Sequence, residues 1–158
     1  MLKKVISGGQ TGVDRLGLSA AKVCGIETGG TAPKGYRTED GNNPTLKTQF
    51  GLMEDNSYLY NNRTEKNVTD SDGTVLFGDM SSSGSKMTIG FIKKHNKPYI
   101  ENPHSNELIS FIEDNNIETL NVAGNRGSKL TIRQLGDFAT ILSNTFNHFK
   151  NGTDRELQ

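Results

Sequence analysis

Short apolar runs alternate along most of the chain with longer segments whose apolar positions recur at helical spacing. The runs rich in aliphatic and β-branched residues predict strands at 4–7, near Ile26, and at 74–77, 99–100 and 119–123. The helical spacing predicts helices over 13–24, from about residue 64, from the serine-rich loop through 94, over 105–115 and over 130–149. Strands separated by helices are typical of an α/β fold with a mostly parallel sheet covered on both faces.

The first expected strand runs into a glycine-rich turn and then a helix, in the sequence MLKKVISGGQTGVDR. Gly8, Gly9 and Gly12 permit backbone angles and close approaches that a Cβ would obstruct, and a helix beginning near Val13 offers unpaired N–H groups. A phosphate suits such a site. The spacing matches neither a Walker loop nor the GxGxxG fingerprint, which disfavours a standard NTPase or NAD enzyme. The alternative is a tight turn without a ligand.

A second loop, GDMSSSGSK, lies between the strand at 74–77 and a helix. Its hydroxyl and amide donors and one cation favour a second phosphate site, from Ser81, Ser82, Ser83, Gly84, Ser85 and Lys86. The alternative for a serine-glycine segment is a flexible connection. Its position between a strand and a helix favours the phosphate site.

The segment GGTAPKGYRTEDGNNP is too rich in glycine and proline for a long helix or an interior strand. It follows the end of a strand, where open α/β sheets bind their ligands. Lys34, Arg37, Glu39 and Asp40 therefore become candidate site residues. Arg63 lies near the start of the next expected helix.

The composition limits the classes of partner. The chain of 158 residues is expected to form one domain over 1–150, with a flexible tail over 151–158. Because 18 Lys and Arg balance 18 Asp and Glu, we expect no binding to duplex nucleic acid or to membranes. No segment has the length of a signal peptide or a membrane span, so a cytoplasmic location is expected. Cys24 is expected in the core, and the three scattered histidines predict no metal site.

Five blocks of sequence together resemble the molybdenum-cofactor carrier family of the SLOG group. These blocks are ISGGQTGVDR at 6–15, ETGGTAPKGYRTEDG at 27–41, NRTEKNVTDSDGTVLF at 62–77, SGSKMTI at 83–89 and LNVAGNRGSK at 120–129. They occur in one order and cover nearly the whole chain. The resemblance implies a single Rossmann-like doubly wound domain that binds a nucleotide or a nucleotide-derived ligand, often as a homo-oligomer.

The resemblance also assigns site residues. It implies that Gly8, Gly9, Gln10 and Thr11 face a phosphate or ribose, that Lys34 and Arg37 reach in from their loop, and that Arg63 and Asn67 line one side. It implies a second phosphate cradle at Ser83, Gly84 and Ser85. Asp14 and Asp72 either bind a ribose hydroxyl or base, or cap the adjoining helix and turn. Asn125 and Arg126, just past a strand end, form a weaker candidate pair.

A departure from the family pattern affects the expected chemistry. Related phosphoribohydrolases have a glutamate early in the helix after the second loop, and Gly90 stands at the corresponding position. A missing carboxylate removes general-base and electrostatic assistance, so we expect ligand binding without turnover.

Three functions remain open. The favoured one is a protein that holds, senses or sequesters a phosphorylated small molecule, such as a nucleotide or a cyclic or ADP-ribose-type derivative. The alternatives are an N-glycosidic hydrolase that uses Asp14, Glu39 or Asp40, and a carrier of molybdopterin.

Overall fold

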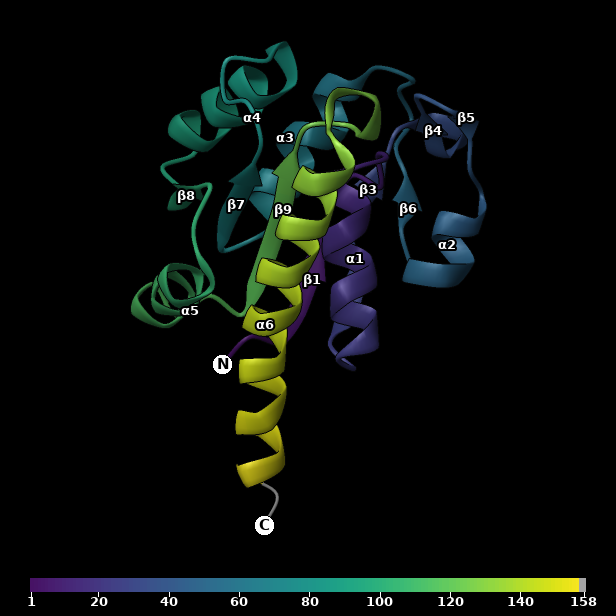
Figure 1. The fold of residues 1–158 in the computed structure, drawn as a ribbon. Helices are drawn as coiled ribbons and strands as arrows, with labels where there is room; N and C mark the ends of the chain where they lie inside the picture. The colour runs from purple at the N-terminus through teal and green to yellow at the C-terminus, as the bar shows by residue number, and fades with distance from the viewer. Residues whose placement is uncertain (157–158) are drawn as a thin grey trace.

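A five-stranded parallel sheet forms the centre of the molecule (Figure 1). The computed structural model describes residues 1–156, with side chains through Lys150. The strands lie in the order β2 (Glu27–Gly29), β1 (Lys4–Ile6), β9 (Thr119–Gly124), β7 (Gly73–Phe77) and β8 (Tyr99–Glu101). The predicted Rossmann-like α/β class is confirmed.

The last strand in the sequence lies in the middle of the sheet. β9 pairs with β1 on one side and with β7 on the other, so that Val5 is opposite Leu120 and Val75 is opposite Val122. All four of these side chains are fully buried, as expected for a parallel sheet covered on both faces. The chain leaves β1 toward one edge and β7 toward the other edge. This reversal places a ligand-binding crevice at the carboxyl ends of β1, β9 and β7.

Helices cover both faces of the sheet. α1 (Val13–Val23), α5 (Ser105–Asp114) and α6 (Ile132–Glu156) pack on one face, over the main core cluster that contains Leu142 and Phe146. α3 (Tyr60–Asp70) and α4 (Ser83–Lys94) pack together on the other face, over Leu76. Cys24 is buried beside α1, so its predicted core position is confirmed.

The predicted elements agree with the structure apart from some of their ends. α3 begins at Tyr60, four residues before the predicted start, because its first turn carries polar residues that break the apolar spacing. α6 begins at Ile132 and extends to Glu156, beyond the predicted end at Phe149. The predicted flexible tail over 151–158 falls where no side chain is described, and residues 157–158 lie outside the described residues.

Residues 30–59 form a small layer beside the main sheet, where the sequence predicts loops. The layer contains β3 (Thr31–Ala32), the 3₁₀ turn η1 (Lys34–Tyr36), β4 (Arg37–Thr38), β5 (Gly41–Asn42), α2 (Thr45–Phe50) and β6 (Met53–Glu54). β3 pairs with β6, and β4 pairs with β5. Leu46, Phe50 and Leu52 form a second core cluster with Leu18 of α1. This cluster fixes the layer against the main domain.

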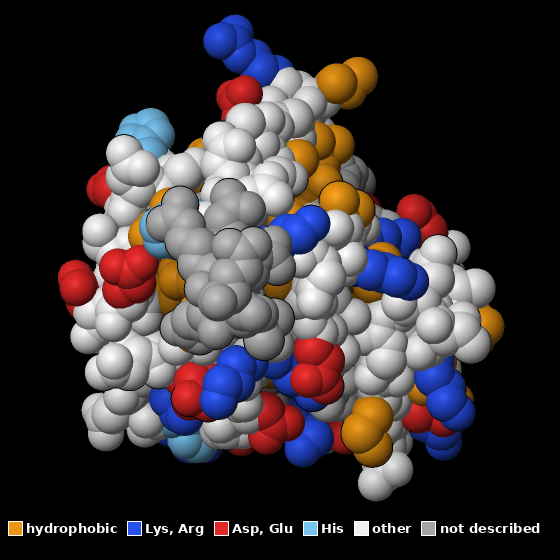
Figure 2. Space-filling view, turned by 90° about the horizontal axis from the view of Figure 1, so that it is seen from below, with side chains coloured by type: hydrophobic (Ala, Val, Ile, Leu, Met, Phe, Trp, Pro, Cys, Tyr) orange, Lys and Arg blue, Asp and Glu red, His pale blue; other side chains and the backbone are white. Residues whose placement is uncertain are grey.

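The end of the molecule opposite the crevice carries mixed charge. Figure 2 shows Lys and Arg side chains interspersed with Asp and Glu on this face. Within residues 1–156, none of the helices has the length and apolar character needed to cross a bilayer.

Candidate functional site

A pocket of about 200 Å³ lies at the carboxyl ends of β1, β9 and β7, between α3 and α4. Its walls come from the β1–α1 turn, the first turns of α3 and α4, the end of β9 and the loop that follows β9. The lining residues are Gly8, Gln10, Asp14, Tyr60, Arg63, Thr64, Asn67, Ser82, Ser83, Gly84, Met87, Thr88, Asn121, Val122, Ala123, Gly124, Asn125, Arg126 and Lys129.

The pocket brings together part of the predicted site. The predicted residues that line it are Gly8, Gln10, Asp14, Arg63, Asn67, Ser82, Ser83 and Gly84. The predicted residues that do not line it are Gly9, Thr11, Gly12, Lys34, Arg37, Ser85 and Lys86. The two phosphate-type loops therefore meet at one site, and each contributes only some of its predicted members.

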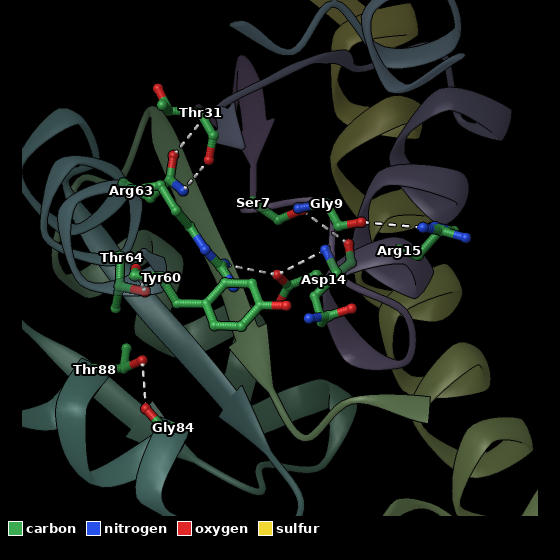
Figure 3. Close-up of polar contacts among 12 residues, drawn as sticks. Ser7, Gly9, Asp14, Arg15, Thr31, Tyr60, Arg63, Thr64, Gly84 and Thr88 are labelled. Atoms are coloured by element: carbon green, nitrogen blue, oxygen red, sulfur yellow. Dashed lines mark hydrogen bonds and ion pairs between the residues drawn. The ribbon is translucent and has the colours of Figure 1, made fainter. Parts of the chain in front are cut away.

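A buried ion pair forms one wall of the pocket. Oδ2 of Asp14, in the first turn of α1, accepts a hydrogen bond from the Gln10 backbone N–H at 3.2 Å and lies 3.3 Å from Nη1 of Arg63 (Figure 3). Asp14 is 5% exposed. Burial raises the pKa of Asp14 above its ordinary value of 3.8, against the opposing effect of the Arg63 charge and the Gln10 hydrogen bond. Asp14 thus holds Arg63 at the pocket.

Two further contacts fix the position of Arg63. The guanidinium lies over the ring of Tyr60, 5.1 Å from the ring centroid. It also fills the space beside Gly8, where a Cβ would lie 1.7 Å from Nη1. Nε of Arg63 is buried without a hydrogen-bond partner among the described residues. Arg63 therefore presents a buried, preoriented cation with an unused donor.

The start of α4 forms the opposite wall. Ser82 caps the helix by accepting a hydrogen bond from the Ser85 N–H at 3.3 Å. Ser83 and Gly84 occupy the next two positions and line the pocket, where their amide groups have no partner within the helix. A Cβ on Gly84 would meet open space, so this part of the helix is accessible. Such a helix start is suited to binding an anion.

Asn125 fixes the start of α4 and has no side-chain donor left for a ligand. Its Nδ2 donates to the Asp79 carbonyl at 3.2 Å and to Oγ of Ser82 at 3.1 Å, and its Oδ1 accepts from the Asp79 N–H at 2.6 Å. The sequence predicts Asn125 as a candidate ligand-binding residue, and the structure places it as the support of the helix cap. Asn125 and its partner in that prediction, Arg126, both line the pocket.

The start of α1, in contrast, is covered by protein. The Val13 N–H donates to the Asn125 carbonyl at 3.1 Å, and a Cβ on Gly12 would lie 2.5 Å from that same oxygen. Gly9 packs against the second core cluster, since its Cβ would lie 2.8 Å from side-chain atoms of Leu46 and Leu52. The predicted anion site at the first helix is thus corrected. Gly9 and Gly12 permit close packing, with φ of +74° and +81°, and only Gly8, Gln10 and Asp14 of this turn line the pocket.

Lys34 and Arg37 do not reach the pocket. Nζ of Lys34 lies over the ring of Tyr58, 5.2 Å from its centroid. Arg37 lies over Tyr60 at 4.6 Å and donates to the Tyr58 carbonyl at 2.9 Å. The expected convergence of Lys34, Arg37 and Arg63 on one phosphate is therefore corrected to Arg63. Stacking on Tyr58 accounts for the placement of Lys34, and stacking on Tyr60 accounts for that of Arg37, which does not itself line the pocket.

The remaining predicted residues of the two loops have structural positions. Ser85 is 2% exposed and faces the interior below the start of α4. Lys86 is exposed outside the pocket, and its charge acts on Asp79. Thr11 donates through its hydroxyl to Glu39 and accepts from the Gly127 N–H at 3.0 Å.

Glu39 ties three loops together instead of facing the pocket. Its carboxylate accepts from the Thr11 hydroxyl, from the Ser128 N–H at 3.0 Å and from the Ser128 hydroxyl at 2.5 Å, and it lies 3.4 Å from Nε of Arg126. Burial raises the pKa of Glu39, but the hydrogen bonds from Ser128 and Thr11 outweigh it and hold the pKa below its ordinary value. These contacts engage the carboxylate fully.

The other acidic candidates lie away from the pocket. Asp72 accepts hydrogen bonds from the Glu118 and Thr119 N–H groups at the opposite, amino end of β9, so it has a structural role between distant segments instead of capping the adjoining helix and turn. Asp40 is exposed and does not line the pocket. Among the described lining residues, Asp14 is the one carboxylate.

Gly90 lies on the exposed side of α4, where a Cβ would meet open space. The side chains that α4 presents to the pocket are Ser83, Met87 and Thr88. The expectation that Gly90 marks a missing catalytic acid is corrected, because this position does not line the site. Its identity has no bearing on the chemistry inside the pocket.

Several lining residues were not predicted from the sequence. They are Tyr60, Thr64, Met87, Thr88, Asn121, Val122, Ala123, Gly124 and Lys129. Asn121 could have been predicted, because it is a polar residue within a largely apolar strand. In the structure it is 3% exposed and lines the pocket. Tyr60 was missed because the start of α3 was predicted too late.

Three cations and one carboxylate line the pocket, so its lining carries net positive charge. Arg63 pairs with Asp14 and Arg126 pairs with Glu39, while Lys129 forms no ion pair with another described residue. No three metal-binding side chains gather at one place anywhere in the described part of the chain. The arrangement therefore suits an anionic ligand held by N–H groups and cations.

The parallel sheet, the crevice at its carboxyl edge and the open start of α4 define a Rossmann-like domain with a ligand pocket. Over residues 5–141 the chain matches the circularly permutated YpsA SLOG family, and it belongs to this family. The resemblance inferred from the sequence motifs is confirmed.

One solved structure is closely similar. It is the crystal structure of a Syntrophus aciditrophicus SB protein named "Putative molybdenum carrier protein", with a TM-score of 0.79 and 33% sequence identity. The similarity covers 92% of this chain and 94% of that chain. No curated protein sequence gives a significant match.

Proposed function

We propose that the protein binds a small molecule carrying a phosphate group, with a nucleotide or nucleotide-derived compound as the favoured class. The observation that carries this proposal is the meeting of the accessible start of α4 with three cations in one pocket. Ser83 and Gly84 offer backbone N–H groups, and Lys129 offers a cation that forms no ion pair with a described carboxylate, although its charge also acts on Asp79. Both features favour an anion over a neutral ligand.

The size and lining of the pocket favour a ligand no larger than a mononucleotide. The volume of about 200 Å³ lies below the roughly 300–1,000 Å³ that is usual for drug-sized ligands. Met87, Val122 and Ala123 supply an apolar surface on which a ring could lie. A dinucleotide would extend into solvent.

Binding without turnover remains the favoured function. Glu39 is engaged by residues of two other loops, and Asp14 is paired with Arg63. A general base that activates water needs an accessible carboxylate at the reacting centre. An N-glycosidic hydrolase acting through Asp14 would have to do so while Oδ2 is engaged by Arg63 and by the Gln10 N–H. Holding or sequestering the ligand requires no such group.

A molybdopterin carrier is the second candidate, and the name of the similar Syntrophus protein favours it. Molybdopterin also carries a phosphate, so the start of α4 would hold either ligand. The two candidates differ in the group attached to the phosphate.

Calorimetric titration of the purified protein with AMP tests the proposal. We expect saturable binding of one molecule per chain, weakened by added inorganic phosphate. Native mass spectrometry, followed by denaturing release, identifies any molecule that co-purifies, and elemental analysis for molybdenum separates the two candidates. Absence of AMP binding at millimolar concentration, together with the absence of any co-purified phosphate compound, would overturn the proposal.

A further inference from the structure

The two carboxylate oxygens of Asp14 have different surroundings. Oδ2 accepts from the Gln10 N–H and pairs with Arg63. Oδ1 accepts no hydrogen bond from any residue that the structure describes. Asp14 is nevertheless 95% removed from solvent, with 5% of its surface exposed, and it lines the pocket. An acceptor with unused capacity thus borders the site.

An unused acceptor of this kind favours a hydrogen-bond donor on the ligand. A carboxylate can accept about four hydrogen bonds, and Oδ1 is open to the pocket rather than fully enclosed by protein. A ligand that supplies an O–H or N–H group at Oδ1 replaces its contact with water by a charge-assisted hydrogen bond. A ligand that places an apolar group there buries the carboxylate oxygen without a donor, which costs free energy.

The same carboxylate repels a phosphate placed directly against Oδ1. Two negative charges in a site largely removed from water repel each other strongly. The ligand's anionic group is therefore better held by the start of α4 at Ser83 and Gly84, by Lys129 and by the Nε–H of Arg63, unpartnered among the described residues, than against Oδ1. Figure 3 shows Asp14 on the side of the β1–α1 turn and Gly84 on α4, away from it.

We propose that Asp14 determines specificity by accepting a hydrogen bond, through Oδ1, from a hydroxyl or amino group of a phosphorylated ligand. This inference rests on the proposed function and deepens it. The substrate class becomes a phosphate monoester whose organic part carries a donor group, such as a nucleoside monophosphate. Inorganic phosphate and pyrophosphate, which have no organic part, fall outside the class.

Calorimetric affinities for four probes test the inference: AMP, 2′,3′-dideoxy-AMP, IMP and inorganic phosphate. AMP should bind more tightly than inorganic phosphate. One of the two analogues should bind at least about tenfold more weakly than AMP, the loss expected when a hydrogen bond to a charged group is removed. A loss with dideoxy-AMP identifies a ribose hydroxyl as the donor, and a loss with IMP identifies the amino group of the base.

The variant Asp14→Asn keeps the size of the side chain and removes its charge. It should reduce the difference between AMP and the discriminated analogue to less than about threefold. Asp72→Asn is the matched control, because Asp72 lies at the opposite edge of the sheet and should keep the full difference. If Asp14→Asn fails to fold, the comparison of probes on the unmodified protein still decides.

The outcomes separate this inference from the proposed function. Equal affinity of the unmodified protein for AMP, dideoxy-AMP and IMP would overturn the role of Asp14 and leave the phosphate site standing. Undiminished discrimination by folded Asp14→Asn would do the same. Failure of all four probes to bind would overturn both proposals together.

Discussion

Gly8 and Arg63 are matched in shape, because the guanidinium of Arg63 occupies the space that a Cβ at position 8 would take, with Nη1 1.7 Å from the Cβ position. The two residues are 55 positions apart in the sequence. Gly8 lies in the turn between β1 and α1, and Arg63 lies in α3. The missing side chain lets Arg63 reach Asp14 inside the pocket. The sequence predicted that Gly8 exposes its backbone to a phosphate. In the structure, the absence of a Cβ at Gly8 makes room for the Arg63 guanidinium.

Gly8→Ala should displace Arg63 and weaken AMP binding by about tenfold, since the contact between guanidinium and ligand is lost. The protein should remain folded, because the displaced atoms belong to the end of a flexible side chain and Gly8 does not have a positive φ. Calorimetry gives the affinity and circular dichroism checks the fold. Gly90→Ala, in open space on α4, is the control and should bind AMP normally. Equal affinity of the two variants would show that the placement of Arg63 does not matter.

Arg63→Ala should weaken AMP binding by about 1.5–3 kcal/mol, or roughly 10- to 150-fold, as expected for a charge-assisted hydrogen bond. The AMP affinity of this variant should also depend less on the salt concentration. Lys34→Ala should change neither property, because Lys34 lies over Tyr58 outside the pocket. Titrations at two salt concentrations provide the comparison. A loss with Lys34→Ala as large as with Arg63→Ala would place the anion site elsewhere.

Glu39→Gln should destabilise the protein by about 1–2 kcal/mol at pH 7, because hydrogen bonds to a charged acceptor are weakened. The folded protein holds the pKa of Glu39 below its ordinary value of 4.5. The stabilisation that ionised Glu39 provides is therefore fully present above pH 4.5. It is lost as the pH falls through the lower pKa that Glu39 has in the folded protein. Urea unfolding at pH 7 and near pH 3 should show the difference from the unmodified protein shrinking at the acidic pH. Glu118→Gln, which breaks an exposed ion pair with Lys3, should have little effect. A difference that grows on acidification would contradict the role of Glu39.

Ser82→Ala removes the cap of α4 and an acceptor of Asn125. We expect a loss of about 1 kcal/mol in the free energy of unfolding. We also expect weaker AMP binding, because the N–H groups of Ser83 and Gly84 lose their fixed positions. Ser19→Ala, on the exposed side of α1, is the control for both measurements. If Ser82→Ala lowers the stability but leaves the AMP affinity unchanged, the start of α4 does not take part in binding.

The sequence was sufficient for the main sheet and its helices, because their apolar positions repeat over long enough stretches. It was insufficient for α2 and the short strands of residues 30–59, whose two- to six-residue lengths carry no clear period. The region was predicted to be functional because it follows a strand. The structure shows that Leu46 and Leu52 of this region build a core against Gly9.

The structure brings the two predicted loops together at one pocket, and only some of their predicted residues face it. The start of α1 is covered by Asn125, which is more than 100 residues away in the sequence. No local sequence pattern reveals such a long-range contact. The side of α4 occupied by Gly90 likewise depends on how the helix packs. Asp14 and Arg63, in contrast, were identified from the sequence and meet at the pocket.

Nuclear magnetic resonance of ¹⁵N-labelled protein titrated with AMP locates the phosphate site, because it reports each N–H group separately. We expect the largest shifts at the backbone amides of Ser83 and Gly84 and at Nε–H of Arg63, with small shifts at Gly12, whose surroundings are covered by Asn125. Shifts centred on Gly9 and Gly12 with none at Ser83 and Gly84, or no shifts at saturating AMP, would show that the start of α4 does not bind the phosphate.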